Sequence, residues 1–314
     1  MPRVAVIGLG TMGAGIAAVM ARSGWQVRTT DIRQGAIEKA QTDLPLIDRV
    51  LDQLAMPSKG STDSIEFVAS LENAVQQADL VLENIPEDLD LKQDLFRALE
   101  PLVSETCMLA SDTSGIPITQ LQTVLEKPGR MVGMHWSNPP HIIPMIEVIP
   151  GEKTDAQTTQ WMVETIKAMK LLPVVVEKDV PGFVENRILY AIMREAIDLV
   201  EQGVVSPEAL DTCVSWGIGY KLGVVGPMAL LDLAGLDIYQ SVSSYLNSQL
   251  SDRSDVSPFI TERTSEGRLG IKTGAGIFSY NKDELGGLVQ ARAKRFIAAR
   301  RALEGTDGEI ESKK

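Results

Sequence analysis

The chain has 314 residues, of which 44% are hydrophobic and 23% charged, and its formal net charge is −12. The hydrophobic share suffices for a full globular core, and the acidic balance argues against nucleic acid or an acidic membrane surface as partner. No run approaches the ~18 apolar residues of a membrane-spanning helix, and no secretory signal pattern is visible, so we expect a cytoplasmic protein without membrane contact.

The N-terminal segment predicts a dinucleotide-binding loop. An apolar strand over residues 3–8 runs into a glycine-rich turn and then into the apolar helix 14–22. In the spacing G-x-G-x-x-G, the first glycine permits a tight turn, the second lets backbone approach a pyrophosphate, and the third lets helix pack on strand. The amide groups at the helix start then face the phosphates. The cofactor contacts predicted here are Gly8, Gly10, Thr11, Met12 and Gly13.

The next strand, Gln26–Thr30, ends at a carboxylate, Asp31. A carboxylate at this distance from the glycine loop accepts both ribose hydroxyls and repels a 2′-phosphate. The strand, the loop, the helix and Asp31 together predict NAD rather than NADP as cofactor.

Strand-like and helical segments alternate as far as residue 180, and several strands are almost continuously apolar. This pattern predicts a Rossmann-type α/β domain over residues 1–180, with a doubly wound parallel sheet buried on both faces. The stretch 34–60 reads as a helical insertion in which Pro45 should break the helix. The further strands expected are Ile65–Ser70, Leu80–Asn84, Met108–Ser111, Met131–His135, Met145–Ile149 and Val174–Glu177.

Strand signals vanish after Pro181-Gly182, and a smaller all-helical domain is expected over residues 181–304, followed by a polar tail over 305–314. Ser206-Pro207-Glu208 has the composition of a helix start. The helices expected are Phe183–Gln202, Glu208–Ser215, Met228–Leu250 and Leu288–Leu303.

A histidine and a glutamate are the strongest candidates for chemistry. His135 and Glu147 lie on two strand-like pieces that flank a loop. A carboxylate near an imidazole fixes its tautomer and stabilises the imidazolium that forms on proton uptake. A structural histidine stays an equal alternative on these residues alone. With only two histidines and two cysteines in the chain, no metal site is expected, and Cys107 and Cys213 read as buried small residues.

These motifs together resemble the L-3-hydroxyacyl-CoA dehydrogenase family over essentially the whole chain. The resemblance is carried by Ser114 in a hydroxyl-rich segment, by H-x-x-N-P from His135, by a glutamate twelve residues later, and by P-G-F-x-x-N-R from Pro181. The turn from Glu83 to Lys92 also matches. It implies an NAD-dependent dehydrogenase in which His135 is the general base, Glu147 orients it, and Ser114 and Asn186 bind the substrate oxygen.

The same resemblance implies further contacts to the cofactor and the substrate. The cofactor contacts implied are Glu87, Lys92, Asp112, Ser114 and Asn138. The family often has Asn where this chain has Asp112. The substrate contacts considered beside Ser114, His135 and Asn186 are His141 and Arg187, each with a structural alternative: loop packing for His141 and pairing with a nearby glutamate for Arg187.

The substrate expected is a small carboxylated molecule rather than a CoA ester. The insertion 34–60 carries Lys39, Arg49 and Lys59 against four acidic residues, which compensates a phosphorylated CoA poorly. Family branches without CoA act on L-gulonate, L-carnitine, or a formyl-pyridine carboxylate of vitamin B6 degradation. Residues 111–119 and 135–144 resemble the last branch most, in which an aldehyde would react as its hydrate.

Three alternatives stay open within this resemblance: a 3-hydroxyacyl-CoA dehydrogenase, a free 3-hydroxy acid dehydrogenase, and a non-catalytic crystallin-like protein. A 3-hydroxyisobutyrate-type enzyme is disfavoured, because the helix expected over Phe183–Gln202 has no lysine to act as catalyst. The resemblance, including the stretch Gly270–Tyr280, also implies a homodimer formed through the helical domain.

Overall fold

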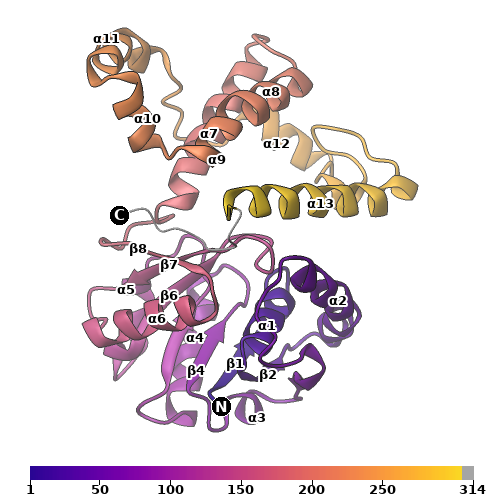
Figure 1. Cartoon of the computed structure of the whole chain (residues 1–314), viewed down its shortest axis with the longest axis vertical. Coiled ribbons are helices and arrows are strands. Elements are labelled where there is room, and N and C mark those ends of the chain that lie inside the picture. Colours follow the sequence, from indigo (N-terminus) through magenta and orange to yellow (C-terminus); the bar gives the residue numbers. More distant parts are fainter. Residues whose placement is uncertain (306–314) are drawn as a thin grey trace. The chain divides into compact units, whose positions relative to one another are not determined.

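A computed structural model describes residues 1–305 (Figure 1). Its centre is one eight-stranded sheet in the order β3-β2-β1-β4-β5-β6-β7-β8. All neighbouring strands are parallel except β6 and β7, which are antiparallel. The strands are β1 (Arg3–Ile7), β2 (Gln26–Thr30), β3 (Glu66–Phe67), β4 (Leu80–Glu83), β5 (Met108–Ser111), β6 (Met131–Trp136), β7 (Met145–Pro150) and β8 (Leu172–Val175). The Rossmann-type sheet expected from the sequence is confirmed.

Helices connect these strands and cover the sheet, which buries the apolar residues of its strands. Val6 and Leu82, on the neighbouring strands β1 and β4, are fully buried. Side chains fix the helix starts: Ser70 accepts from Asn73 N, and Asp88 from Leu91 N. The helices are α1 (Gly13–Arg22), α2 (Gln34–Gln53), α3 (Leu71–Val75), α4 (Leu89–Leu99), α5 (Ile118–Leu121) and α6 (Ala156–Ala168).

Two details differ from the expectation. Helix α2 continues through Pro45, because this proline is exposed and the carbonyl it leaves without a helical donor can bind water. The last strand begins at Leu172 rather than Val174 and includes Pro173. Proline is tolerated there because β8 is the edge strand of the sheet.

After Phe183 the chain is helical, as expected. The helix expected over Met228–Leu250 is divided at Gly235, whose φ of 95° is a conformation that glycine adopts without strain. Helix α12 was not expected. A turn of π-helix, Val214–Gly219, joins α8 to α9. The helices are α7 (Glu185–Glu201), α8 (Pro207–Cys213), α9 (Tyr220–Val224), α10 (Pro227–Ala234), α11 (Leu236–Leu246), α12 (Pro258–Ser265) and α13 (Leu285–Leu303).

Contacts divide the chain into two compact units. Residues 1–186 form the dinucleotide unit together with residues 296–305, and residues 187–295 form the helical unit. The hydrophobic core lies in the dinucleotide unit: no hydrophobic side chain described between residues 187 and 295 is fully buried. Cys213, expected to be buried, is exposed for this reason, whereas Cys107 is buried. Beyond Gly305, the predicted polar tail lies outside the described residues.

No single helix in the described chain has the length and apolar composition to cross a membrane. One bent pair, Pro207–Val224 with Pro227–Ala234, passes that test when the two helices are taken together.

Candidate active site

Two of the three motif glycines in the loop at the carboxyl end of β1 have no room for a side chain. Gly8 has a φ of +98°, and a Cβ there would lie 2.6 Å from the carbonyl oxygen of Asn84. A Cβ at Gly13 would lie 2.0 Å from the oxygen of Gly8, so helix and strand approach closely. At Gly10 the nearest atom is 3.9 Å away, on the Arg33 guanidinium. The backbone beside Gly10 is therefore open to a ligand, as the pyrophosphate of a dinucleotide requires.

Asp31 closes this loop from the end of β2. Its carboxylate accepts from Leu9 N at 2.8 Å and from Arg33 N at 2.8 Å, and it pairs with the Arg33 side chain. Burial works against the charged form, but these hydrogen bonds outweigh it and lower the pKa of Asp31. An ionised acceptor therefore stands beside the open glycine loop, where an adenosine ribose would be held.

A buried network lies at the end of β4. The Lys92 ammonium, 1% exposed, lies 2.6 Å from Glu83 and 3.5 Å from Glu87, and it donates to the Ile85 oxygen. Burial raises the pKa of Glu83, although Lys92 opposes the shift. Ser111 also donates to Glu83, at 2.5 Å. The described contacts of Lys92 are thus with the protein itself. Glu83, which the sequence marks as the start of the matching turn but not as a site residue, holds the ammonium group.

Glu87 connects this network to the segment that contains Ser114. One carboxylate oxygen, Oε1, accepts from the Thr113 hydroxyl at 2.7 Å, from Ser114 N at 3.0 Å and from Gly115 N at 2.9 Å. Burial alone would raise the pKa of Glu87, but these donors and Lys92 lower it. The ionised carboxylate therefore fixes the turn, and Ser114 itself is exposed. Asn186 donates to the Ser114 oxygen at 2.6 Å, which brings these two predicted residues together.

His135 and Glu147 face each other across the antiparallel strands β6 and β7. His135 Nδ1 lies 2.8 Å from Glu147 Oε2, and both side chains are buried. The other oxygen of Glu147 accepts from Val184 N at 2.9 Å and from Glu185 N at 3.1 Å, at the start of α7. The Glu147 carboxylate thus accepts hydrogen bonds from one imidazole nitrogen and two backbone amides.

The charges at this pair favour a basic imidazole. Burial would raise the pKa of Glu147, but the hydrogen bond from His135 and the two amides lower it. Burial would lower the pKa of His135, but the hydrogen bond to Glu147 and the charge of that carboxylate raise it. Because an ionised carboxylate only accepts, His135 Nδ1 is the donor, and in the neutral ring Nε2 carries the lone pair. That nitrogen can take a proton from an alcohol.

Two further acidic groups lie near the imidazole. Asp112 accepts from Trp136 N at 2.7 Å, and burial raises its pKa to about 8. Glu185 binds the Ser137 hydroxyl with both carboxylate oxygens. A ring nitrogen of His135 and one carboxylate oxygen each of Glu147 and Glu185 lie within 4.8 Å of one another. The sequence points to Glu185 only indirectly. The residue lies inside the P-G-F-x-x-N-R motif, but at a position where the motif allows any residue.

The loop between β6 and β7 carries the remaining predicted residues. Asn138 is exposed and precedes a cis proline, Pro139. His141 packs against α1, where a Cβ at Gly15 would lie 3.1 Å from His141 Nδ1. Burial lowers the pKa of His141 to about 4, so the ring is neutral near pH 7. Arg187, the residue after Asn186 on α7, is exposed. Substrate contact by His141 and Arg187 stays a prediction.

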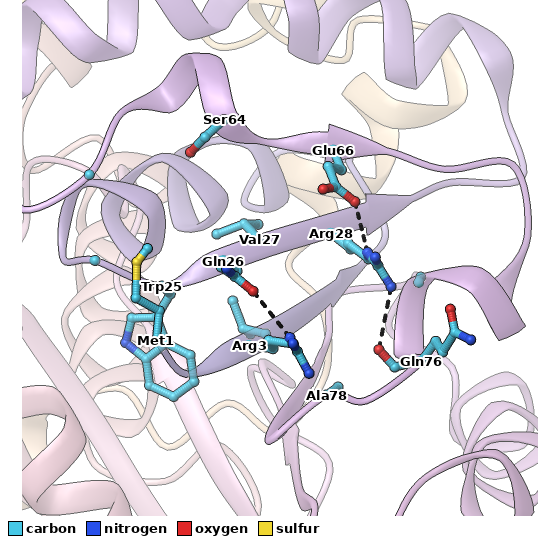
Figure 2. A pocket seen from close by; sticks show the side chains of 14 residues that line it. Met1, Arg3, Trp25, Gln26, Val27, Arg28, Ser64, Glu66, Gln76 and Ala78 are labelled. Carbon is cyan, nitrogen blue, oxygen red and sulfur yellow. Dashed lines mark hydrogen bonds and ion pairs between the residues drawn. The ribbon is translucent and has the colours of Figure 1, made fainter.

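A cavity of about 250 Å³ lies elsewhere, beside the amino ends of β1 and β2 (Figure 2). Its charged groups are paired within the protein: Arg3 donates to Gln26, and Arg28 to Glu66. The glycine loop, Asp31 and the Ser114 turn instead follow the carboxyl ends of the strands, where ligands bind to doubly wound sheets.

Comparison with known proteins agrees with this geometry. The family model described as 3-hydroxyacyl-CoA dehydrogenase, NAD binding domain, matches residues 3–180, and that of the C-terminal domain matches residues 182–280. The chain is 56% identical to 5-formyl-3-hydroxy-2-methylpyridine 4-carboxylate 5-dehydrogenase of Mesorhizobium japonicum, covering 97% of this chain and 99% of that protein. It is 34% identical to 3-hydroxybutyryl-CoA dehydrogenase of Clostridioides difficile, covering 89% of this chain and 100% of the relative.

A solved structure is also similar over nearly the whole length. It is that of a 5-formyl-3-hydroxy-2-methylpyridine 4-carboxylic acid 5-dehydrogenase, an NAD⁺-dependent dismutase. The TM-score is 0.94 at 55% identity, covering 97% of this chain and 99% of the other.

Proposed function

The chain belongs to the 3-hydroxyacyl-CoA dehydrogenase family and is an NAD-dependent dehydrogenase, and from this premise we propose that it oxidises 5-formyl-3-hydroxy-2-methylpyridine 4-carboxylate to the dicarboxylate. The observation that carries the chemistry is the buried pair of His135 and Glu147, 2.8 Å apart. The substrate is proposed from the relative that is 56% identical over 97% of the chain.

The aldehyde would react as its hydrate, which is chemically an alcohol. Bound NAD supplies the hydride acceptor. His135 Nε2 takes a hydroxyl proton while the hydride leaves the carbon, and the hydrate becomes a carboxylic acid. Glu147 holds the ring and balances its charge once it is protonated. No cysteine nucleophile is needed, in keeping with Cys107, whose pKa burial raises to about 12.

Ser114 and Asn186 would bind the reacting oxygen. The Ser114 hydroxyl lies at the exposed end of the turn that Glu87 fixes. The Asn186 amide lies beside it. The Ser114 hydroxyl donates to Glu87 at 3.2 Å in this structure and would turn its proton to the substrate, and the Asn186 amide has a second N–H to offer. Both are neutral donors, which suit an oxygen that gains carbonyl character during the reaction. Because Glu87 is ionised and anchored by three donors, it positions this pair.

Asp112 would contact the nicotinamide in the place of the family's asparagine. With a pKa of about 8, it is mostly protonated near neutral pH. A protonated carboxyl offers one O–H donor and one acceptor oxygen, as a side-chain amide offers N–H and oxygen. The substitution therefore keeps the donor that a carboxamide oxygen needs. Asn138, Glu87 and Lys92 complete the proposed set, with Lys92 acting through the two glutamates.

The same site would also reduce the free aldehyde, since the solved relative is a dismutase. One hydrate gives the acid, NADH and a proton. A second aldehyde then takes the hydride and the proton and becomes the alcohol. Two aldehydes and one water thus give one acid and one alcohol, and NAD is regenerated.

The test is turnover by the purified protein with NAD and a panel of four substrates. The panel contains the formyl-pyridine carboxylate, 3-hydroxybutyryl-CoA, L-carnitine and L-gulonate. We expect NADH and the dicarboxylate from the first, and at substoichiometric NAD equal amounts of acid and alcohol. Efficient turnover of the CoA ester, with the pyridine aldehyde inert, would contradict the proposal.

The helical unit supports a homodimer. Large apolar side chains are exposed along its helices, among them Trp216 at 75%, Met228 at 70% and Leu233 at 73%. Large apolar side chains exposed in this way are typical of a surface that another protein covers. Light scattering at micromolar concentration should give twice the chain mass of 34.1 kDa, and a monomeric mass would refute the dimer.

A further inference from the structure

The chain continues beyond the region that defines the family. The C-terminal family model ends at residue 280, and helix α13 begins at Leu285. The 3-hydroxybutyryl-CoA dehydrogenase of Clostridioides difficile aligns over its whole length, and this alignment covers 89% of the present chain. The alignment with the Mesorhizobium japonicum enzyme covers 97%. Residues of α13 from Phe296 onward belong to the dinucleotide unit. The end of the helix is therefore itself part of the unit that contains the catalytic pair.

A buried arginine, Arg300, holds this end of the helix in the unit. The Arg300 side chain is 6% exposed. It donates to the carbonyl oxygen of Ile142 at 2.9 Å and to Glu304 at 2.6 Å, and its third nitrogen lies 3.1 Å from the sulfur of Met56. Ile297, one turn earlier, is also buried. A buried guanidinium with several partners is a fixed contact, because losing one partner leaves its charge uncompensated.

Ile142 lies in the loop that joins the two catalytic strands. The loop leaves β6 directly after His135 and Trp136 and enters β7 two residues before Glu147. On one side it packs on α1, where a Cβ at Gly15 would lie 2.8 Å from Pro140. The second contact of the loop is the hydrogen bond that Arg300 donates to the carbonyl oxygen of Ile142. Among the described residues this is the donor to that buried oxygen, so the loop is fixed at two points.

We propose that Arg300 is a positioning residue of the dehydrogenase: through Ile142 it holds the β6–β7 loop and thereby the geometry of His135 and Glu147. The C-terminal helix is then part of the framework of the active site. Its contribution reaches the reacting atoms only through the loop, and it does not depend on which substrate the enzyme takes.

The test compares Arg300→Met with Arg301→Met, a matched control. Arg301 lies next on the same helix, but its guanidinium is exposed and donates to the Gln53 oxygen, away from the loop. Because displacements of about 1 Å can cost up to ~100-fold in rate, we expect Arg300→Met to lower kcat about tenfold. The KM for NAD should change less than kcat, since Asn138 is the one proposed cofactor contact on this loop, whereas Asp31 and the glycine loop are untouched.

Hydrogen exchange gives a readout that does not depend on activity. In Arg300→Met the amides of His141, Ile142 and Ile143, the loop residues after the two prolines, should exchange faster, while the amides of α1 stay as in the wild type. In Arg301→Met all of these amides should exchange as in the wild type. Arg300→Lys should recover part of kcat, because an ammonium still donates to Ile142, and it serves as the kinetic variant if the methionine form does not fold.

The possible outcomes separate the two proposals. The kinetic arm rests on the proposed function and uses whichever panel substrate the wild type turns over. An inert pyridine aldehyde contradicts the proposed substrate and leaves hydrogen exchange as the test of Arg300. Unchanged kcat and unchanged loop exchange in Arg300→Met, with only a lower Tm, would overturn the positioning role.

Discussion

The two units of the chain use their apolar residues in opposite ways. In the dinucleotide unit, strand residues such as Val6 and Leu82 are fully buried. In the helical unit, side chains as large as Trp216 and Leu233 are mostly exposed, and no hydrophobic residue described there is fully buried. The first unit therefore has a core of its own, and its strands β6 and β7 hold the proposed catalytic pair. The second, as a single copy, leaves its apolar faces uncovered, as expected for an element stabilised by association.

The largest effect is expected in the chemistry of the dinucleotide unit. Glu147→Gln should lower kcat about 10³-fold, because the imidazole loses its tautomer partner and its charge balance. Glu147 helps to raise the pKa of His135. The neutral ring is the base, so oxidation rises with pH through this pKa. Without the carboxylate the pKa falls, and the rising limb should move to lower pH. The control Glu152→Gln changes an exposed glutamate and should leave the pH–rate profile unchanged.

A matched pair of truncations compares the cores directly. Leu82→Ala, in a fully buried strand position, should cost about 2–5 kcal/mol of unfolding free energy at any protein concentration. Leu233→Ala, 73% exposed in one copy, should matter only where a second copy covers it. Its effect on Tm should then shrink as dilution separates the dimer and leaves the side chain exposed. Denaturation at two concentrations decides this, and a concentration-independent loss for Leu233→Ala would argue for a core within the helical unit.

Asp31 gives a smaller effect on cofactor choice. Asp31→Ser removes the carboxylate that repels a 2′-phosphate and releases the paired guanidinium of Arg33. We expect the preference for NAD over NADP, measured as a ratio of kcat/KM, to fall about 100-fold. Adding Arg33→Met should reverse the gain with NADP. A preference that stays constant in Asp31→Ser would exclude Asp31 as the discriminating residue.

The smallest effect is expected at Asp112. If its protonated form acts as the family's asparagine does, Asp112→Asn should keep kcat within about threefold near neutral pH. The wild type should bind NAD less tightly as the pH rises through about 8, where Asp112 ionises, and the variant should not. Titration of NAD affinity against pH measures this, and identical profiles would show that Asp112 does not donate to the cofactor.

The sequence located much of the site because its parts are local. The glycine loop, the strand before it and Asp31 form one continuous segment, and the P-G-F-x-x-N-R motif marks the start of α7. The helix through Pro45 and the strand through Pro173 were misjudged, because whether a proline is tolerated depends on solvent and sheet edges, which a sequence does not show. The helix expected over Met228–Leu250 is divided because Gly235 has a positive φ. A sequence does not show which of its glycines adopt such an angle.

By itself, the sequence determined the fold class, the cofactor and the pairing of His135 with Glu147, because periodicity and motif spacing encode strands, turns and their faces. Only the tertiary structure decided that Lys92 is held by Glu83 and Glu87, that Glu185 stands beside the imidazole, and that Arg300 reaches Ile142. These contacts join segments distant in the chain. They depend on which surfaces the fold brings together and on which charges burial forces into pairs.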